Sequence, residues 1–469
     1  MTPLSALDAL FLHLESPATP MHVGALHRLR APRDRAGYLE RLRTVVASRL
    51  HLAPPFTRQL VNMPLEFADP VWVEAPKVDL ARHIRRVRLP RPGTQAQLHA
   101  VVARLHARLL DRSRPLWRMT LIEGLDSGEL ALFTQFHHAT LDGAAGVLLG
   151  QALLDLGPRP RRVPPPPEHA PEAAPGTMRL AAAGLASSAR KTARLARGLP
   201  SLAKSVAAAV SLFAQPAART RLARNLGLGP STPFNCAIHP ARRVATMSLP
   251  LAPIKAVARA RGVTLNDVVL AIVAGGLRDY LKTQGALPRK PLVAAIPVSL
   301  RESGNSAFST LATMTLTSLA TDRADPLERL GRVHEAASAA KALTGSLRGL
   351  IPTDLPSLGL PWLLSAGAAL YARASAGERL PPIANLVVSN VPGPPVPLYL
   401  AGARVLTWWP MSIVEHGLGL NITLMSYAGS LDFGLVAARD AVPDLDRLAH
   451  ALANSWAALE AATQAASEA

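Results

Sequence analysis

The feature that most limits how this chain can fold is a proline-rich segment over residues 157–176. Eight of these twenty residues are proline. Proline lacks a backbone N–H and has a fixed φ, so the segment forms neither a regular helix nor a central strand. We therefore expect an extended linker between two separately folded parts of the chain.

A second compositional break follows directly, over residues 178–230. It holds nine Arg or Lys residues and no Asp or Glu, against a formal net charge of +19 for the whole chain. Its apolar residues fall on one helical face and its basic residues on the opposite one. The basic face consists of Arg190, Arg194, Arg197 and Lys204. The two breaks predict an N-terminal domain over 1–157, a linker over 158–240 and a C-terminal domain over 241–469.

A cationic amphipathic segment of this kind suits an anionic membrane or lipid-droplet surface, where each charge contributes about 1 kcal/mol. The alternative is a linker whose apolar stripe packs on the domains and leaves its arginines in water. Nucleic acid is not expected as a partner, because only Phe213 and Phe234 lie near the basic stretch as stacking platforms.

Apolar runs on either side of the breaks follow the periods of strands and helices. Strands are predicted over 130–136, 244–249, 292–298, 418–427 and 431–437, and helices over 143–156, 264–282 and 444–460. Val387 and Val388 lead from a further strand into a Pro-Gly turn at 391–395. Strands interleaved with helices in both halves predict two mixed α/β domains.

Several classes of protein are excluded by composition. A single cysteine, Cys236, excludes an internal disulfide framework and a cysteine-built metal site, and favours a reducing compartment. Residues 1–14 have no basic region and carry Asp8 inside their apolar run, so no signal peptide is expected. The longest uncharged stretch, 355–372, contains two prolines and predicts a loop leading into a buried or interfacial helix.

The strongest chemical signal is the heptad HHATLDG at residues 137–143, between a predicted strand and a predicted helix. A histidine at a strand end can stay neutral, as a general base must. Asp142 can fix the turn by capping the helix or by pairing with a distant Arg, and Gly143 permits close backbone approach. The alternative is a histidine pair that closes a strand, with Asp142 as an ordinary cap. No other His or Asp cluster completes a metal site, so none is expected.

Motifs of other catalytic classes are missing. The chain has no G-x-S-x-G nucleophile elbow, no P-loop, no H-E-x-x-H and no dinucleotide fingerprint. The favoured chemistry is therefore a histidine that acts as base on an incoming nucleophile, without a covalent step.

The heptad resembles the H-H-x-x-x-D-G motif of CoA-dependent acyltransferases related to chloramphenicol acetyltransferase and to peptide-synthetase condensation domains. Nearly the whole chain resembles the bacterial wax ester synthase/diacylglycerol acyltransferase family. Five further segments carry this resemblance in order: residues 4–26, Pro115-Leu116-Trp117, Asn266-Asp267, SNVPGP at 389–394 and LDFGLVAARDAVPD at 431–444.

The resemblance implies two mixed α/β sandwich domains of the chloramphenicol acetyltransferase-like type around a central substrate channel, with the heptad at its middle. Acyl-CoA would be the co-substrate, with no other cofactor, and a diacylglycerol or a long-chain alcohol the acceptor. His138 would take the acceptor's hydroxyl proton, while Asp142 organises the site and His137 lies beside it. The enzyme would work in the cytoplasm, on the inner membrane face or on lipid inclusions.

Other motif residues are implied at the substrate channel, but each has a structural alternative. They are Gly143, Pro115, Leu116, Trp117, Asn266, Asp267, Ser389, Asn390 and Gly393. Thr264 and Asp267 are spaced like a capping box, which begins a helix. Trp117 could equally belong to a core, and Asn390 and Gly393 could only turn the chain.

Two further functions stay open at this stage. A relative in the same superfamily could acylate another alcohol or an amine. A lipid-droplet protein could have kept the fold with little activity, although the intact heptad argues against this.

Overall fold

The structure is a computed structural model that describes most of the chain. The described residues are 1–30, 32, 37–64, 68–141, 143–166, 229–299, 312–347 and 382–468, with six isolated residues between 176 and 193. Asp142, nearly all of the basic segment 178–230 and the uncharged stretch 355–372 lie outside them. The expectations for these parts stay predictions.

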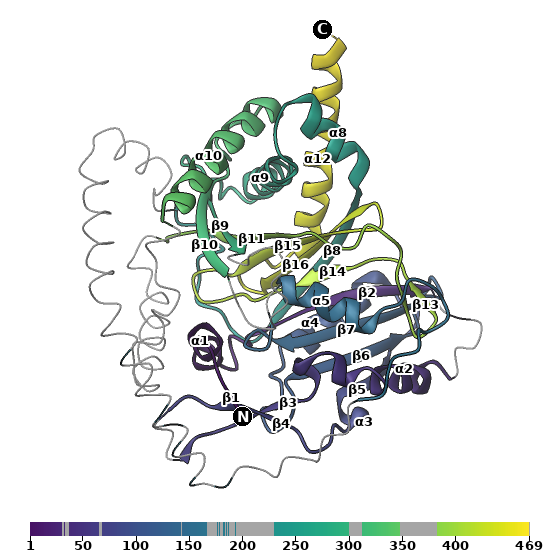
Figure 1. Cartoon of the computed structure of the whole chain (residues 1–469). Coiled ribbons are helices and arrows are strands. Elements are labelled where there is room, and N and C mark those ends of the chain that lie inside the picture. Colours follow the sequence, from purple (N-terminus) through teal and green to yellow (C-terminus); the bar gives the residue numbers. More distant parts are fainter. Residues whose placement is uncertain are drawn as a thin grey trace.

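The N-terminal half of the chain builds most of one sheet. In order, its strands are β12 (Tyr399–Leu400), β13 (Ala403–Val405), β2 (His22–Arg30), β7 (Leu130–His137), β6 (Trp117–Glu123) and β5 (Ile84–Arg88). Helix α4 (Gln95–His106) packs on one face, and α2 (Tyr38–Ala47) and α5 (Gly143–Leu153) on the other (Figure 1). Helix α1 (Ala6–Leu14) lies nearer a small sheet of β1 (Thr2–Pro3), β4 (Val71–Glu74) and β3 (Arg58–Val61).

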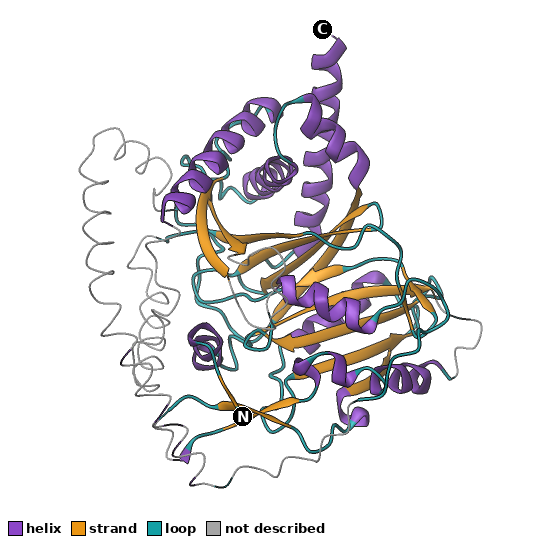
Figure 2. Ribbon diagram, in the orientation of Figure 1, coloured by secondary structure: helices purple, strands orange, loops and turns teal. Residues whose placement is uncertain are grey.

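The C-terminal half builds a second, mixed sheet. Its order is β10 (Ala312–Ser318), β9 (Val293–Ser299), β11 (Leu386–Val391), β15 (Leu420–Tyr427), β16 (Ser430–Ala438) and β8 (Arg242–Pro250). Four helices cover the face that points away from the first sheet (Figure 2). They are α8 (Leu251–Ala260), α9 (Leu265–Thr283), α10 (Pro326–Leu347) and α12 (Leu445–Glu468).

Two mixed α/β halves confirm the fold class predicted from the sequence. The predicted helix over 264–282 is α9, and its first turn is closed by a capping box. Thr264 Oγ1 accepts from Asp267 N at 3.2 Å, and Asp267 Oδ2 accepts from Thr264 N at 2.9 Å. Within the described residues, no helix alone has the length and apolar composition of a membrane span. Only α8 and α9 taken together, bent by 105°, meet that test.

The start of the proline-rich segment is anchored by a buried ion pair. Arg49 Nη2 lies 2.8 Å from Asp155 Oδ1, and both side chains are buried. Asp155 also pairs through its backbone with Tyr399, which belongs to the C-terminal half. Residues 160–166 then run on without regular secondary structure.

The sheets do not follow the division of the sequence into 1–157 and 241–469. A crossing segment, residues 399–411, leaves the C-terminal half and supplies β12, β13 and β14 (Trp409–Met411) to the N-terminal sheet. Strand β14 pairs with β2, with Met411 opposite Gly24. The predicted domain limits are therefore bridged by strand pairing, and the limits themselves stay a prediction.

Asp432 of β16 fastens this crossing segment to the second sheet. Its carboxylate is buried and accepts hydrogen bonds from Trp408 N at 2.6 Å, Ser248 Oγ at 2.7 Å and Ser430 Oγ at 2.7 Å. Burial raises the pKa of Asp432. The three hydrogen bonds lower it, but by less. Three donors thus depend on one side chain.

We expect Asp432→Ala to lower the free energy of unfolding by about 3 kcal/mol, because it leaves buried donors without an acceptor. Urea denaturation followed by tryptophan fluorescence measures the loss. Asp440→Ala, at an exposed position just beyond β16, is the matched control and should unfold like the wild type. Equal stability of the two variants would show that Asp432 does not hold the crossing segment.

Candidate active site

Strand β7 ends at the histidine pair, and the two side chains have different surroundings. His137 is the last residue of β7, lies opposite His22 of β2 and is fully buried. His138 is partly accessible and lies on the wall of a cavity. Because side chains alternate along an extended chain, two adjacent histidines reach opposite sides of it.

The turn that carries His138 is held by hydrogen bonds on both sides. His138 N donates to Met21 O at 2.8 Å, and Thr140 donates to His137 O through its backbone N at 2.9 Å and its Oγ1 at 2.7 Å. Ala139 N donates to His137 Nδ1 at 3.1 Å. A ring nitrogen that accepts a hydrogen bond carries no proton, so the proton of neutral His137 lies on Nε2.

Glu15 contacts the Nε2 side of the His137 ring. Its Oε1 lies 3.2 Å from His137 Nε2 and accepts from Met21 N at 3.3 Å. Its Oε2 accepts from Arg112 Nε at 3.0 Å and Nη2 at 2.8 Å. Burial alone would raise the pKa of Glu15, but the contacts with His137 and Arg112 outweigh it and lower the pKa to about 2. Glu15 is therefore an ionised clamp that joins helix α1 to the histidine turn.

Helix α1 also supports His138 directly. The rings of Phe11 and His138 stack with centroids 4.0 Å apart and an interplanar angle of 16°. This stacking limits rotation of the imidazole, so His138 presents a defined edge to the cavity.

The cavity has a volume of about 480 Å³ and lies between the two sheets and helix α5. Most of its lining is apolar, as in small-molecule sites of about 300–1,000 Å³. Strand β2 contributes Val23, Ala25, His27 and Leu29, β7 contributes Leu132, Thr134 and Phe136, and α5 contributes Gly146, Leu149, Gly150 and Leu153. The C-terminal half contributes Val387, Ser389 and Val391, Trp408 and residues 410–413, Glu415, Leu418, Asn421, Thr423 and Met425.

The cavity changes in character along β2. Val23 pairs with Phe136, next to the histidine turn, whereas Leu29 pairs with Leu130 at the other end of β7. Six residues of strand span about 20 Å at roughly 3.3 Å each. The far end is lined by Leu29, Leu132, Leu153, Leu154, Leu400 and Val405. The site therefore has one polar end at His138 and a long apolar end that fits an alkyl chain.

Some of the residues predicted from the sequence lie at this site. Ser389 lines the cavity, and Gly143 begins α5 directly after the histidine turn. Leu116 lies beneath the turn, where its backbone O accepts from His137 N at 3.0 Å and its side chain packs with Ala139. Asp142 lies outside the described residues, so its role stays a prediction.

Trp117 and Pro115 do not reach the cavity. The indole of Trp117 is buried, donates to Phe56 O at 3.0 Å and stacks on His83 with centroids 4.2 Å apart. Pro115 is buried beside it, and its backbone O accepts from Trp117 N at 2.9 Å. Together with Leu116, this triplet acts in the core and supports the turn from below.

Neither Asn266 nor Asp267 lines the cavity. Asp267 caps α9 and accepts from His334 Nδ1 at 2.8 Å, on the helical side of the second sheet. A side chain at Gly393 would meet Ser426 O at 2.2 Å, so this glycine allows the chain after β11 to approach β15. Asn390 falls between the cavity-lining Ser389 and Val391, on the other face of β11. A substrate-binding role for these residues stays a prediction.

Sequence reasoning missed Glu15, Phe11 and Glu415. The first two lie inside the segment 4–26 that resembles the family's opening, but their spacing follows no known catalytic pattern. Glu415 lies in none of the resembling segments. Among the residues that the structure describes, no three His, Cys, Asp or Glu side chains gather as metal ligands do.

Comparisons with known proteins show which family the chain belongs to. The sequence model of the wax ester synthase/diacylglycerol acyltransferase catalytic domain matches residues 4–269, and that of the family's C-terminal domain matches residues 310–460. A putative diacylglycerol O-acyltransferase of Mycobacterium tuberculosis is 37% identical over 468 residues, which cover 98% of this chain and 99% of that protein. A second, a probable diacylglycerol O-acyltransferase of the same organism, is 36% identical over 471 residues and covers 97% of this chain and 98% of its own length.

Solved structures show the same likeness. The wax ester synthase/diacylglycerol acyltransferase from Marinobacter aquaeolei superposes with a TM-score of 0.70 at 32% identity, covering 99% of this chain and 100% of that one. The first condensation domain of the calcium-dependent antibiotic synthetase shares the fold, with a TM-score of 0.55 at 17% identity over 97% of this chain and 96% of its own. The chain therefore belongs to the wax ester synthase/diacylglycerol acyltransferase family of enzymes.

Proposed function

We propose that this protein transfers a long-chain acyl group from acyl-CoA to the hydroxyl of a diacylglycerol or a long-chain alcohol, with His138 as general base. The observation that carries the proposal is the place of His138, at the polar end of an apolar cavity long enough for an alkyl chain. The family relatives named above support the same reaction class. The product would be a triacylglycerol or a wax ester.

In this mechanism the acceptor hydroxyl donates its proton to the His138 imidazole as its oxygen attacks the thioester carbonyl. The tetrahedral intermediate then collapses, the C–S bond breaks, and the imidazolium returns the proton to the departing CoA thiolate. The stack on Phe11 and the hydrogen bond to Met21 hold the base in position. Both substrates are bound together, and no acyl group is carried by the protein.

Two other side chains that could compete with His138 are poor candidates. His27 also lines the cavity, but burial lowers its pKa to about 4, which makes it a weak base. Burial, followed by the charge of Asp440, raises the pKa of Cys236, so less of its thiol is ionised. Cys236 is also not among the residues that line the cavity.

Docking on an anionic membrane or lipid-droplet surface through the basic segment 178–230 remains part of the proposal, as does a cytoplasmic, peripheral location. Both rest on the charge and periodicity of that segment. A different alcohol or an amine as acceptor is the alternative. Labelled palmitoyl-CoA with a panel of acceptors, resolved by thin-layer chromatography, separates these possibilities.

Replacing His138 by Ala should lower kcat by about a hundredfold or more, because the reaction loses a positioned base. Steady-state rates with palmitoyl-CoA and dioleoylglycerol measure the effect. The variant should melt like the wild type, since His138 faces a cavity. His137→Ala should mainly destabilise the protein, because this ring is buried against Glu15. A stable His137→Ala protein that is as inactive as His138→Ala would contradict the assignment.

Direct transfer predicts that the protein never carries the acyl group. Cys236→Ala should therefore keep its activity, and incubation of the wild type with labelled palmitoyl-CoA alone should leave no label on denatured protein. Mass spectrometry of the intact chain is the measurement. A stoichiometric acyl adduct that disappears in the Cys236 variant would overturn this mechanism.

The contribution of the Glu15 clamp to the free energy of unfolding depends on pH, and the direction follows from its pKa. Its pKa in the folded protein, about 2, lies below the ordinary value of 4.5. The clamp therefore stabilises the fold above pH 4.5, and this contribution is lost as the pH falls toward 2. We expect Glu15→Gln to cost about 2–3 kcal/mol of unfolding free energy at neutral pH and less in acid.

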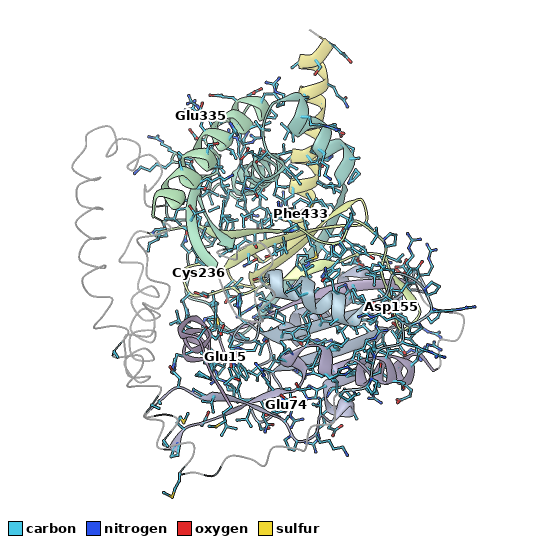
Figure 3. The ribbon with its side chains drawn as sticks, in the orientation of Figure 1. Glu15, Glu74, Asp155, Cys236, Glu335 and Phe433 are labelled. Carbon is cyan, nitrogen blue, oxygen red and sulfur yellow. The ribbon has the colours of Figure 1, made fainter. Side chains whose placement is uncertain are left out.

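Urea denaturation between pH 3 and pH 7 measures the difference in free energy of unfolding between the wild type and Glu15→Gln. The titration of other carboxyl groups affects both proteins equally and cancels in this difference. The exposed Glu74, on β4, supplies the control variant Glu74→Gln (Figure 3). A cost for Glu15→Gln that does not change with pH would show that the carboxylate charge plays no part in the clamp.

A further inference from the structure

Glu415 lines the same cavity as His138, and the mechanism above does not use it. It lies between β14 and β15. The chain leaves β14 at Met411, opposite Gly24 of β2, two residues from His22. His22 pairs with His137, so the segment that carries Glu415 begins at the end of the sheet where the histidine turn lies.

The backbone of Glu415 is held in a tight turn. Leu418 N donates to Glu415 O at 3.0 Å, and Gly417 has a φ of 77°, which suits the third position of a type II turn. The turn is fastened to the segment before β8, where Gly417 N donates to Cys236 O at 2.9 Å and Gly417 O accepts from Asn235 Nδ2 at 2.8 Å. Such a support fixes the backbone of Glu415 on the cavity wall.

The neighbouring amide and hydroxyl on this wall already have partners. Asn421 Nδ2 donates to Ile413 O at 2.9 Å, and Asn421 Oδ1 accepts from Thr423 Oγ1 at 2.7 Å. Within the described part of the chain, the Glu415 carboxyl makes no hydrogen bond or ion pair, and burial raises its pKa. Its carboxyl group is thus available to a ligand in the cavity.

We propose that Glu415 is a specificity-determining residue for the acyl acceptor, whose carboxylic acid donates a hydrogen bond to an ester carbonyl oxygen of a diacylglycerol. This inference rests on the proposed function and names the substrate class that the site prefers. A hydrogen bond of this kind leaves the base chemistry of His138 unchanged and acts on binding of the acceptor.

The number of oxygen atoms in each substrate favours this role. A long-chain alcohol has one oxygen, and that oxygen must face His138 to lose its proton. A diacylglycerol has a hydroxyl and two ester carbonyl groups, so one carbonyl can accept from Glu415 while the hydroxyl faces His138. With a simple alcohol the Glu415 carboxyl gains no hydrogen bond from the substrate, whereas a diacylglycerol ester supplies one acceptor. The site is therefore built to prefer the diacylglycerol.

The test compares two acceptors in the full chain, dioleoylglycerol and hexadecanol, presented in the same detergent micelles with labelled palmitoyl-CoA. Glu415→Met fills the same space without a proton to donate. It should lower kcat/KM for dioleoylglycerol by about ten- to a hundredfold, while kcat/KM for hexadecanol changes by less than about threefold. Glu415→Gln keeps a donor and should stay close to the wild type with both acceptors.

Thermal melting of each variant, with the exposed Glu335→Gln on α10 as the matched control, separates loss of folding from loss of selectivity (Figure 3). Equal losses on both acceptors in a folded Met variant, or no loss on either, would overturn the inference. If Glu415→Met does not fold, Glu415→Gln still tests the inference. A fall in kcat/KM of the Gln variant for dioleoylglycerol alone would show that a neutral donor is not what the site uses. A wild type that acylates neither acceptor overturns the proposed function itself, and this inference with it.

Discussion

Strand β14 holds the two halves of the molecule together, and the cavity exists because of it. It pairs with β2 of the first sheet while its backbone lies directly on β16 of the second. A Cβ at Gly434 would lie only 1.7 Å from Pro410 O, so only glycine permits this approach. Asp432, two residues earlier on β16, accepts from the Trp408 backbone N and locks the same crossing. The two sheets are thereby joined at this crossing, and residues of both line the cavity.

The two adjacent histidines have different surroundings because they lie at the end of a strand. One ring points into the protein, where Ala139 N and Glu15 fix its tautomer and orientation. The other ring faces the cavity and rests on Phe11. Glu15 can stay ionised in this apolar setting because His137 contacts one of its oxygens and Arg112 binds the other with two hydrogen bonds. The negative charge of Glu15 therefore lies beside His137 and is paired with Arg112.

The sequence predicted the parts of this site that depend on local pattern. The strand, the histidine turn and α5 follow from hydrophobic period and from the glycine at position 143, and the Thr264–Asp267 capping box follows from spacing. Trp117 and Asp267 show the limit of such motifs, because their side chains lie in the core and at a helix cap. The crossing segment and Glu415 could not be predicted, since each depends on contacts between residues more than a hundred positions apart, such as Trp409 with Leu26.

The glycines of α5 show how the fold gives up stability for room inside the site. Gly146 and Gly150 lie one turn apart on the helix and both line the cavity. A glycine inside a helix costs about 1 kcal/mol relative to alanine, so two beyond the first residue of an eleven-residue helix are not neutral choices. At Gly150 the reason is direct, because a Cβ there would lie 2.5 Å from Cη2 of Trp408, whose ring also packs against His27. At Gly146 a Cβ would meet only Leu141 at 3.8 Å, so the missing side chain leaves free space. The helix that follows the histidine turn is thus kept narrow along the cavity, and Trp408 lies against it at Gly150.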